Sequence, residues 1–216
     1  TMIERVRFAP SPTGPLHIGG LRTALFNYLF AKNRNGKLIL RIEDTDRNRL
    51  VGNSETYIED ALLWAGIIPD EGPSKKGNYG PYRQSERIDL YKKMVQGLIN
   101  SGKAYYAFDS NESLATLRKD EEKKGLVFKY DSSIREGLDN SLRMNSSDLR
   151  ARIKNDDYVI RLKVDAGITV TDDILRGRVS FNNNVLDDKI LIKTDGFPTY
   201  HFANVVDDLS LIHISE

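Results

Sequence analysis

A histidine at the junction of a strand and a helix is the first candidate for chemistry. Residues 6–30 read VRFAPSPTGPLHIGGLRTALFNYLF and predict a short strand, a proline-rich turn and a helix over residues 21–33. Such a junction collects free backbone N–H groups and the positive end of the helix dipole, which together favour phosphate. His17 adds a side-chain donor at this point, and Gly19 and Gly20 let a ligand approach the backbone closely. The stretch therefore predicts a phosphate-binding site.

The glycine spacing alone does not specify which phosphate compound binds there. The chain contains neither G-x-x-x-x-G-K-[ST] nor G-x-G-x-x-G, the two common phosphate-binding fingerprints. A histidine at the start of a helix is also a common capping or surface residue. Both interpretations of His17 remain open from the residues themselves.

Charged residues follow the first two predicted strands. Arg7 lies near the end of the first strand, where ligands bind in open parallel sheets, and its fork suits a carboxylate better than a lysine would. The alternative for Arg7 is a solvated charge, and Ser11 is either a turn residue or a second donor. The next strand, residues 37–42, runs into Glu43, Asp44 and Asp46. These acids could cap the next segment, bind a metal or act in acid–base catalysis.

Composition excludes several classes of protein. The 216 residues carry almost balanced charge, with a formal net charge of +1, so any nucleic-acid surface has to be local. The absence of cysteine excludes disulfides, thiolate catalysis and the usual structural zinc sites. No apolar run reaches membrane-spanning length, and no leader pattern precedes the first strand. We therefore expect a cytoplasmic protein without zinc.

The remaining pattern changes character near residue 105. Before it, Ser54 predicts the cap of a helix ending near residue 65, with Trp64 in the core, and Gly36 predicts the end of the preceding helix. After it, a charged helix is predicted over residues 112–124, an irregular stretch over 131–155, and short strands over 105–108, 158–164, 168–171, 178–181 and 190–193. A βα region followed by short strands predicts an α/β fold with an inserted α+β domain.

Four motifs together identify a family. FAPSPTGPLHIGG with LRTALFNYLFA closely resembles the nucleotide-binding signature of class I aminoacyl-tRNA synthetases, in the form found in glutamyl-tRNA synthetases. RIEDTDRNR, GPYRQSER and TDGFPTYHFANVVDD match the same family. The resemblance implies a Rossmann-like catalytic domain over residues 1–104 and 190–208, split by an inserted tRNA acceptor-binding domain over residues 105–189. It stops after residue 208, so we expect a truncated chain whose residues 209–216 are foreign to the family.

The resemblance also implies roles for individual residues. The glutamate-binding set is Arg7, Ser11, Glu43, Tyr200 and Asn204; the ATP-binding set is Ala9, His17, Gly19 and Gly20; and Asp46 and Arg49 face the tRNA. His17 is the expected catalytic residue, because it would stabilise charge on the transferred phosphate. Asp207 and Asp208 are possible magnesium ligands that we do not favour. The implied cofactors are ATP and Mg²⁺ without zinc, and the implied partners of this expected monomer are L-glutamate and the acceptor end of tRNA.

The implied reaction joins glutamate to tRNA through glutamyl-adenylate. The family's lysine-bearing loop for the ATP phosphates is missing from this sequence, so we expect binding to exceed turnover. Three alternatives remain: a transferase that glutamylates a modified tRNA base, a small-molecule nucleotidyltransferase, and a non-catalytic fragment that binds acceptor stems.

Overall fold

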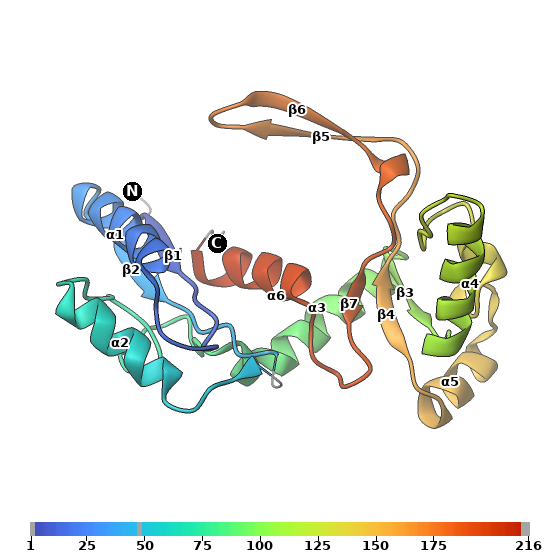
Figure 1. The fold of residues 1–216 in the computed structure, drawn as a ribbon, viewed down its shortest axis with the longest axis horizontal. Helices are drawn as coiled ribbons and strands as arrows, with labels where there is room; N and C mark the ends of the chain where they lie inside the picture. The colour runs from blue at the N-terminus through green and yellow to red at the C-terminus, as the bar shows by residue number, and fades with distance from the viewer. Residues whose placement is uncertain (1–2, 47–48, 213–216) are drawn as a thin grey trace. The chain divides into compact units, whose positions relative to one another are not determined.

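The chain forms two compact units. In the computed structural model, which describes residues 3–46 and 49–212, the first unit comprises residues 1–92 and 197–216 and the second comprises residues 93–196 (Figure 1). The second unit is thus inserted into the first along the sequence. The predicted α/β fold with an inserted α+β part is confirmed. Within the described ranges, no helix combines the length and apolar character needed to cross a membrane.

The first unit is built on a parallel strand pair. Strands β1 (Arg5–Phe8) and β2 (Lys37–Leu40) pair in register from Arg5 with Lys37 to Phe8 with Leu40, and helix α1 (Ile18–Asn33) connects them. The unit also contains α2 (Ser54–Trp64), η2 (Gln84–Arg87), α6 (Tyr200–Asp207) and the π-helical turn η6 (Asp208–Ile212). Helix α3 (Ile88–Asn100) begins in this unit and ends in the other.

The two faces of this strand pair differ in chemistry because side chains alternate along a strand. One face is apolar and packs against α1 and α2; its core contains Val6, Phe8, Leu38, Leu40, Ala24, Ala31, Ile58 and Leu62. On the other face, Arg5 and Arg7 lie beside Lys37 and Ile39. Leu211 of η6 is fully buried in a cluster with Ile39 and Tyr82, and Ile212 packs against this cluster, whereas Leu209 is 57% exposed. Residues 213–216 lie outside the described residues.

Three details of the first unit differ from expectation. Helix α1 begins at Ile18 rather than residue 21, because His17 caps it. Gly36 does not end that helix with a left-handed turn. A glycine is needed there because a Cβ would lie only 2.4 Å from the backbone oxygen of Glu4. Trp64 was wrongly assigned to the core, since it is 85% exposed. Its position on α2 is opposite the buried Ile58 and Leu62, and a helix of this period buries one stripe.

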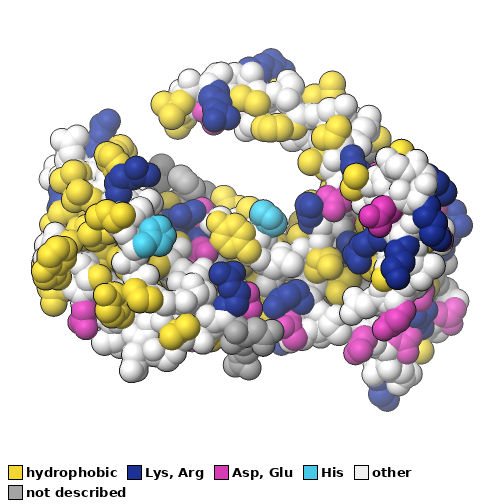
Figure 2. All heavy atoms as spheres, in the orientation of Figure 1, with side chains coloured by type: hydrophobic (Ala, Val, Ile, Leu, Met, Phe, Trp, Pro, Cys, Tyr) yellow, Lys and Arg dark blue, Asp and Glu magenta, His cyan; other side chains and the backbone are white. Residues whose placement is uncertain are grey.

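Hydrophobic side chains also remain on the outer side of α1 and α2, where Figure 2 shows them gathered on the displayed face. Phe26, Leu29 and Phe30 of α1 are 67%, 53% and 46% exposed. In α1, only the two alanines Ala24 and Ala31 are buried, because small side chains let the helix approach the sheet closely.

The second unit is an antiparallel sheet with helices. Strands β3 (Ala104–Ala107), β4 (Val159–Leu162) and β7 (Ile190–Ile192) form it in the order β3–β4–β7, and helices α4 (Asn111–Lys123) and α5 (Ser146–Asn155) belong to the same unit. The hairpin β5 (Ile168–Asp173) and β6 (Gly177–Asn182) forms a separate sheet.

Two features of this unit were not predicted. Residues 131–155 were expected to be irregular, but Asn145 caps α5 by accepting from the N–H groups of Ser147 and Asp148. The return to the first unit was expected at residue 190, whereas β7 pairs with β4 and the first unit resumes at residue 197. Pairing between strands distant in sequence therefore decides where the second unit ends.

Candidate active site

His17 caps helix α1 with its side chain. Its Nδ1 accepts from the backbone N–H groups of Gly19 at 3.1 Å and Gly20 at 3.4 Å. A ring nitrogen that accepts a hydrogen bond carries no proton, so in the neutral ring the proton lies on Nε2. His17 is exposed, which leaves Nε2–H as a donor toward a ligand. The two interpretations of His17 are therefore compatible, but the N–H groups of Gly19 and Gly20 bind His17 here rather than being free.

A cavity of about 480 Å³ opens beside this cap. Its size is within the range of small-molecule sites. The cavity brings together six of the predicted site residues, namely Ser11, His17, Gly20, Glu43, Asp46 and Arg49, and its apolar wall includes Phe8 and Ile58. Asp46 and Arg49 are exposed at this site and joined by a backbone hydrogen bond of 3.1 Å. Residues proposed for glutamate, ATP and tRNA thus share one cavity.

A second group of predicted residues meets at Arg41. Its Nη2 donates to Glu43 Oε1 at 2.9 Å and to Asn204 Oδ1 at 2.8 Å, and its Nη1 donates to Asp208 Oδ1 at 2.7 Å. Arg7 joins the same group, with Nε 2.8 Å and Nη2 3.0 Å from the two oxygens of Asp208 and Nη2 3.2 Å from Asn204 Oδ1. Tyr200 lies at the edge, where its hydroxyl accepts from Asn204 Nδ2 at 3.4 Å. We call Arg7, Arg41, Glu43, Asn204 and Asp208 the Arg41 cluster.

The charges of this cluster shift one another's protonation. Burial raises the pKa of Glu43 above its ordinary value, against the opposing hydrogen bond from Arg41. Burial also acts to raise the pKa of Asp208, but the hydrogen bonds from Arg7 and Arg41 outweigh it, and the pKa lies below its ordinary value. The hydrogen bond to Asp208 raises the pKa of Arg7. Opposite charges at hydrogen-bond distance therefore keep Arg7 and Asp208 ionised.

Asp207 anchors α6 beneath the cluster. It is fully buried and accepts from Gln84 Nε2 at 2.8 Å, from Arg87 Nε at 2.7 Å and from the hydroxyl of Tyr91 at 2.9 Å. Asp207 and Asp208 thus bind arginines and a tyrosine rather than forming an open acidic pair. In the parts of the chain that the structure describes, no group of three or more histidine, cysteine or acidic residues could hold a metal ion.

Sequence reasoning missed Arg41 and misjudged Asp208. A signal for Arg41 was present, since it interrupts the apolar run of KLILRI, yet only the carboxylates after that strand were considered. Asp208 was weighed solely as a metal ligand, and its pairing with Arg41, 167 residues away, has no local signal.

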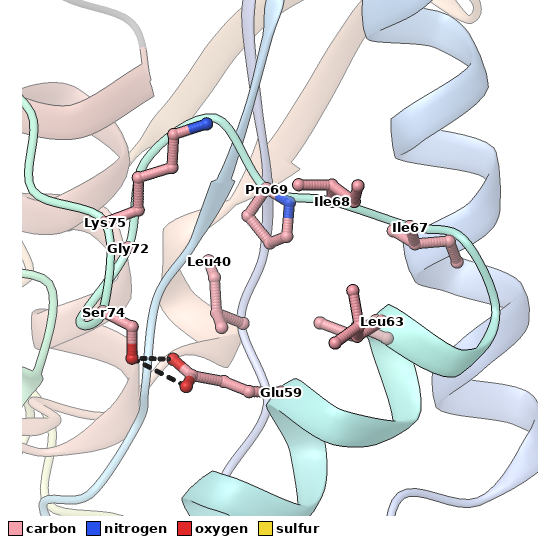
Figure 3. A pocket seen from close by; sticks show the side chains of 10 residues that line it. Leu40, Glu59, Leu63, Ile67, Ile68, Pro69, Gly72, Ser74 and Lys75 are labelled. Carbon is pink, nitrogen blue, oxygen red and sulfur yellow. Dashed lines mark hydrogen bonds between the residues drawn. The ribbon is translucent and has the colours of Figure 1, made fainter.

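Another cavity of about 210 Å³ lies between α2 and the loop that follows it (Figure 3). Its wall includes Leu63, Ile67 and Ile68, and Ser74 Oγ donates to Glu59 at its rim. None of the predicted site residues lines it.

Comparison with known proteins identifies the family. The family model of the class I tRNA synthetases (E and Q), catalytic domain, matches residues 4–216, a range that includes residues 209–216. A glutamate–tRNA ligase of Flavobacterium psychrophilum is 60% identical over 206 residues, covering 94% of this chain and 41% of that protein. One from Mesomycoplasma hyopneumoniae is 49% identical over 209 residues, covering 96% and 43%.

Solved structures agree. A glutamate tRNA ligase from Elizabethkingia meningosepticum, crystallised in complex with its amino acid, superposes with a TM-score of 0.90 at 50% identity and covers 97% of this chain and 42% of that one. The chain thus spans about two-fifths of the length of the relatives it matches. The resemblance seen in the motifs is confirmed, and the chain belongs to the family of class I tRNA synthetases for glutamate and glutamine.

Proposed function

We propose that this chain is the part of a glutamate–tRNA ligase that binds glutamate and ATP and forms glutamyl-adenylate. The observation that supports this most is the Arg41 cluster, which gathers Arg7, Glu43 and Asn204 at the carboxyl ends of β1 and β2. Ligands bind at this edge of parallel sheets. Relatives named as glutamate–tRNA ligases support the choice of substrate.

Glutamate carries two carboxylates and an α-amino group, and the proposed pocket offers complementary charges. Arg7 Nη1 makes no hydrogen bond to the described residues, so it is available to a substrate carboxylate while Nε and Nη2 bind Asp208. Glu43 Oε2 is similarly available to the α-amino group, since Arg41 binds Oε1. Ser11, Tyr200 and Asn204 complete the proposed glutamate site.

ATP fits the cavity beside His17. Ala9, Gly19 and Gly20 supply the backbone along which the nucleotide would lie, and Nε2–H of His17 would stabilise charge on the α-phosphate. A carboxylate oxygen of glutamate attacks the α-phosphorus, and pyrophosphate leaves. Mg²⁺ would enter bound to the ATP phosphates and neutralise their charge, since it prefers substrate phosphates with few protein carboxylates. Asp46 and Arg49, at the cavity rim, would then face the tRNA ribose that accepts the glutamyl group.

A thermal melt of this chain tests the proposal. A non-hydrolysable glutamyl-adenylate analogue at about 100 times its Kd should stabilise the folded state by about 2.7 kcal/mol. The glutaminyl analogue serves as the control. A shift with the glutamyl compound alone supports the proposed site, whereas equal shifts with both contradict glutamate selection. A cooperative melt with no shift contradicts a preformed adenylate site in this chain.

A further inference from the structure

Arg41 is the most enclosed member of its cluster. Its side chain is 0% exposed, and its two terminal nitrogens serve Glu43, Asn204 and Asp208. Its Nε lies 3.8 Å from Asp207 and has no hydrogen-bond partner among the described residues. Burying a guanidinium with one of its nitrogens unpaired is costly in free energy, so stability alone does not explain the placement of Arg41. The placement calls for a role beyond stability.

We propose that Arg41 is a positioning residue that orients the amide of Asn204 and the carboxylate of Glu43, and thereby makes the pocket select a carboxylate over a carboxamide. The inference rests on the proposed function, whose substrate it makes more specific. Arg41 itself makes no contact with the substrate.

The orientation of Asn204 follows from what arginine can do. Arginine donates hydrogen bonds and never accepts them, so the atom of Asn204 that lies 2.8 Å from Arg41 and 3.2 Å from Arg7 has to be its oxygen. The amide nitrogen is then turned to the opposite side, toward the Tyr200 hydroxyl at 3.4 Å. Asn204 therefore offers its N–H donors, rather than its carbonyl, on the side of Tyr200.

The donors that remain explain the selection. Arg7 Nη1, the second N–H of Asn204 and the O–H of Tyr200, whose oxygen accepts from Asn204, all present hydrogen. A carboxylate accepts from all of them, whereas the NH₂ of a carboxamide cannot accept from Arg7 Nη1 or from the Asn204 N–H, which only donate, and leaves both unpaired. Donors that a bound ligand covers and leaves unpaired discriminate strongly between such close analogues. If the side-chain amide of Asn204 could flip and present its oxygen instead, the pocket would accept a carboxylate or a carboxamide.

A matched pair of substitutions tests the role of Arg41. Arg41→Lys keeps the charge but loses the planar fork that reaches two acceptors at once. Arg5→Lys makes the same change on the neighbouring strand, where Arg5 binds Glu71 and lies outside the cluster. Isothermal titration with the two analogues gives, for each variant, the dissociation constant of the glutaminyl-adenylate analogue divided by that of the glutamyl-adenylate analogue. A high ratio means selection of the glutamyl compound.

We expect Arg41→Lys to reduce this ratio at least tenfold, mainly through weaker binding of the glutamyl compound, and Arg5→Lys to leave it within twofold. An unchanged ratio in folded Arg41→Lys overturns the inference. If Arg41→Lys does not fold, Asn204→Asp decides, because it keeps the oxygen that both arginines bind and removes the donor. Normal selection in Asn204→Asp overturns the inference, whereas failure of the unsubstituted chain to bind the glutamyl analogue counts against the proposed function and the inference together.

Discussion

Two arginine–carboxylate clusters lie on the same face of the β1–β2 pair and differ in how completely their groups are paired. In the first, Arg5 donates to both oxygens of Glu71 at 2.8 and 2.7 Å and to the backbone oxygen of Leu211 at 2.6 Å. Glu71 also accepts from Lys37 and from the hydroxyl of Tyr82. We call these groups the Glu71 cluster. In the Arg41 cluster, one guanidinium is divided among three acceptors and its Nε has no partner among the described residues.

From this difference we propose a structural role for the Glu71 cluster and a ligand-binding role for the Arg41 cluster. The Glu71 cluster satisfies its own groups, so a ligand would gain nothing there. The Arg41 cluster leaves Arg7 Nη1 and Glu43 Oε2 available and is adjacent in sequence to the residues that line the His17 cavity. Substitutions in the two clusters should therefore separate effects on folding from effects on binding.

The largest expected effect is that of Asp207→Ala. Asp207 is fully buried, and its loss leaves the buried charge of Arg87 without its carboxylate and removes one of the three carboxylates that pair with Arg41. Removing one partner of a buried ion pair costs about 3–5 kcal/mol. Urea unfolding followed by circular dichroism measures this loss of unfolding free energy. Asp208→Ala is the matched control. The side chain of Asp208 is 28% exposed, so its removal should reduce the unfolding free energy clearly less. Equal losses in the two variants would contradict this ranking.

Glu71→Gln should reduce the unfolding free energy by about 1.5–3 kcal/mol at pH 7, the value of hydrogen bonds to a charged group. The hydrogen bond from Arg5, acting against burial, lowers the pKa of Glu71 from 4.5 to about 2. A carboxyl group with a depressed pKa stabilises the fold above its unfolded pKa, and this stabilisation is lost as the pH falls from about 4.5 to about 2.

The difference in unfolding free energy between the unsubstituted chain and Glu71→Gln should accordingly be constant from pH 7 to pH 5 and shrink below pH 4.5. Urea titrations at pH 7, 5 and 3 measure this difference. If this difference is as large at pH 3 as at pH 7, the stabilisation by Glu71 does not depend on its charge.

Gly77→Ala tests the packing of the Glu71 cluster without removing any polar group. A Cβ at Gly77 would lie 2.5 Å from the carboxyl carbon of Glu71 and 2.6 Å from the hydroxyl oxygen of Tyr82, so one of them has to move. We expect a loss of about 1–2 kcal/mol in urea unfolding, as for other overpacked sites. Gly97→Ala is the control, since nothing lies within 4 Å of its Cβ in helix α3. It should be neutral or stabilising by about 0.5–1 kcal/mol.

The smallest effect on stability is expected for His17→Ala, about 0.5–1 kcal/mol for a lost helix cap. Its effect on adenylate formation should be much larger: in a complete enzyme that contains this chain, we expect a loss of about 10²–10³ in the rate of glutamate-dependent pyrophosphate exchange. His17→Asn retains a capping oxygen and should recover the stability but not the rate. Full activity in His17→Ala would remove His17 from the proposed mechanism.

Much of the site was accessible from local sequence. The strand–turn–helix junction and the charged residues that follow the first two predicted strands are local properties, because neighbouring residues determine turn geometry and side-chain direction. These patterns predicted the fold class, and the motifs built on them identified the family. They also indicated both interpretations of His17.

Tertiary structure alone decided which charges meet. Arg41 and Asp208 are 167 residues apart, and their contact depends on how α6 and η6 pack over the charged face of the strand pair. The same packing buries Asp207 and Leu211, whereas Trp64 stays exposed because its side of α2 receives no partner among the described residues. A sequence determines the direction of each side chain along its own element, but which element covers that side chain depends on contacts that form only in the folded chain.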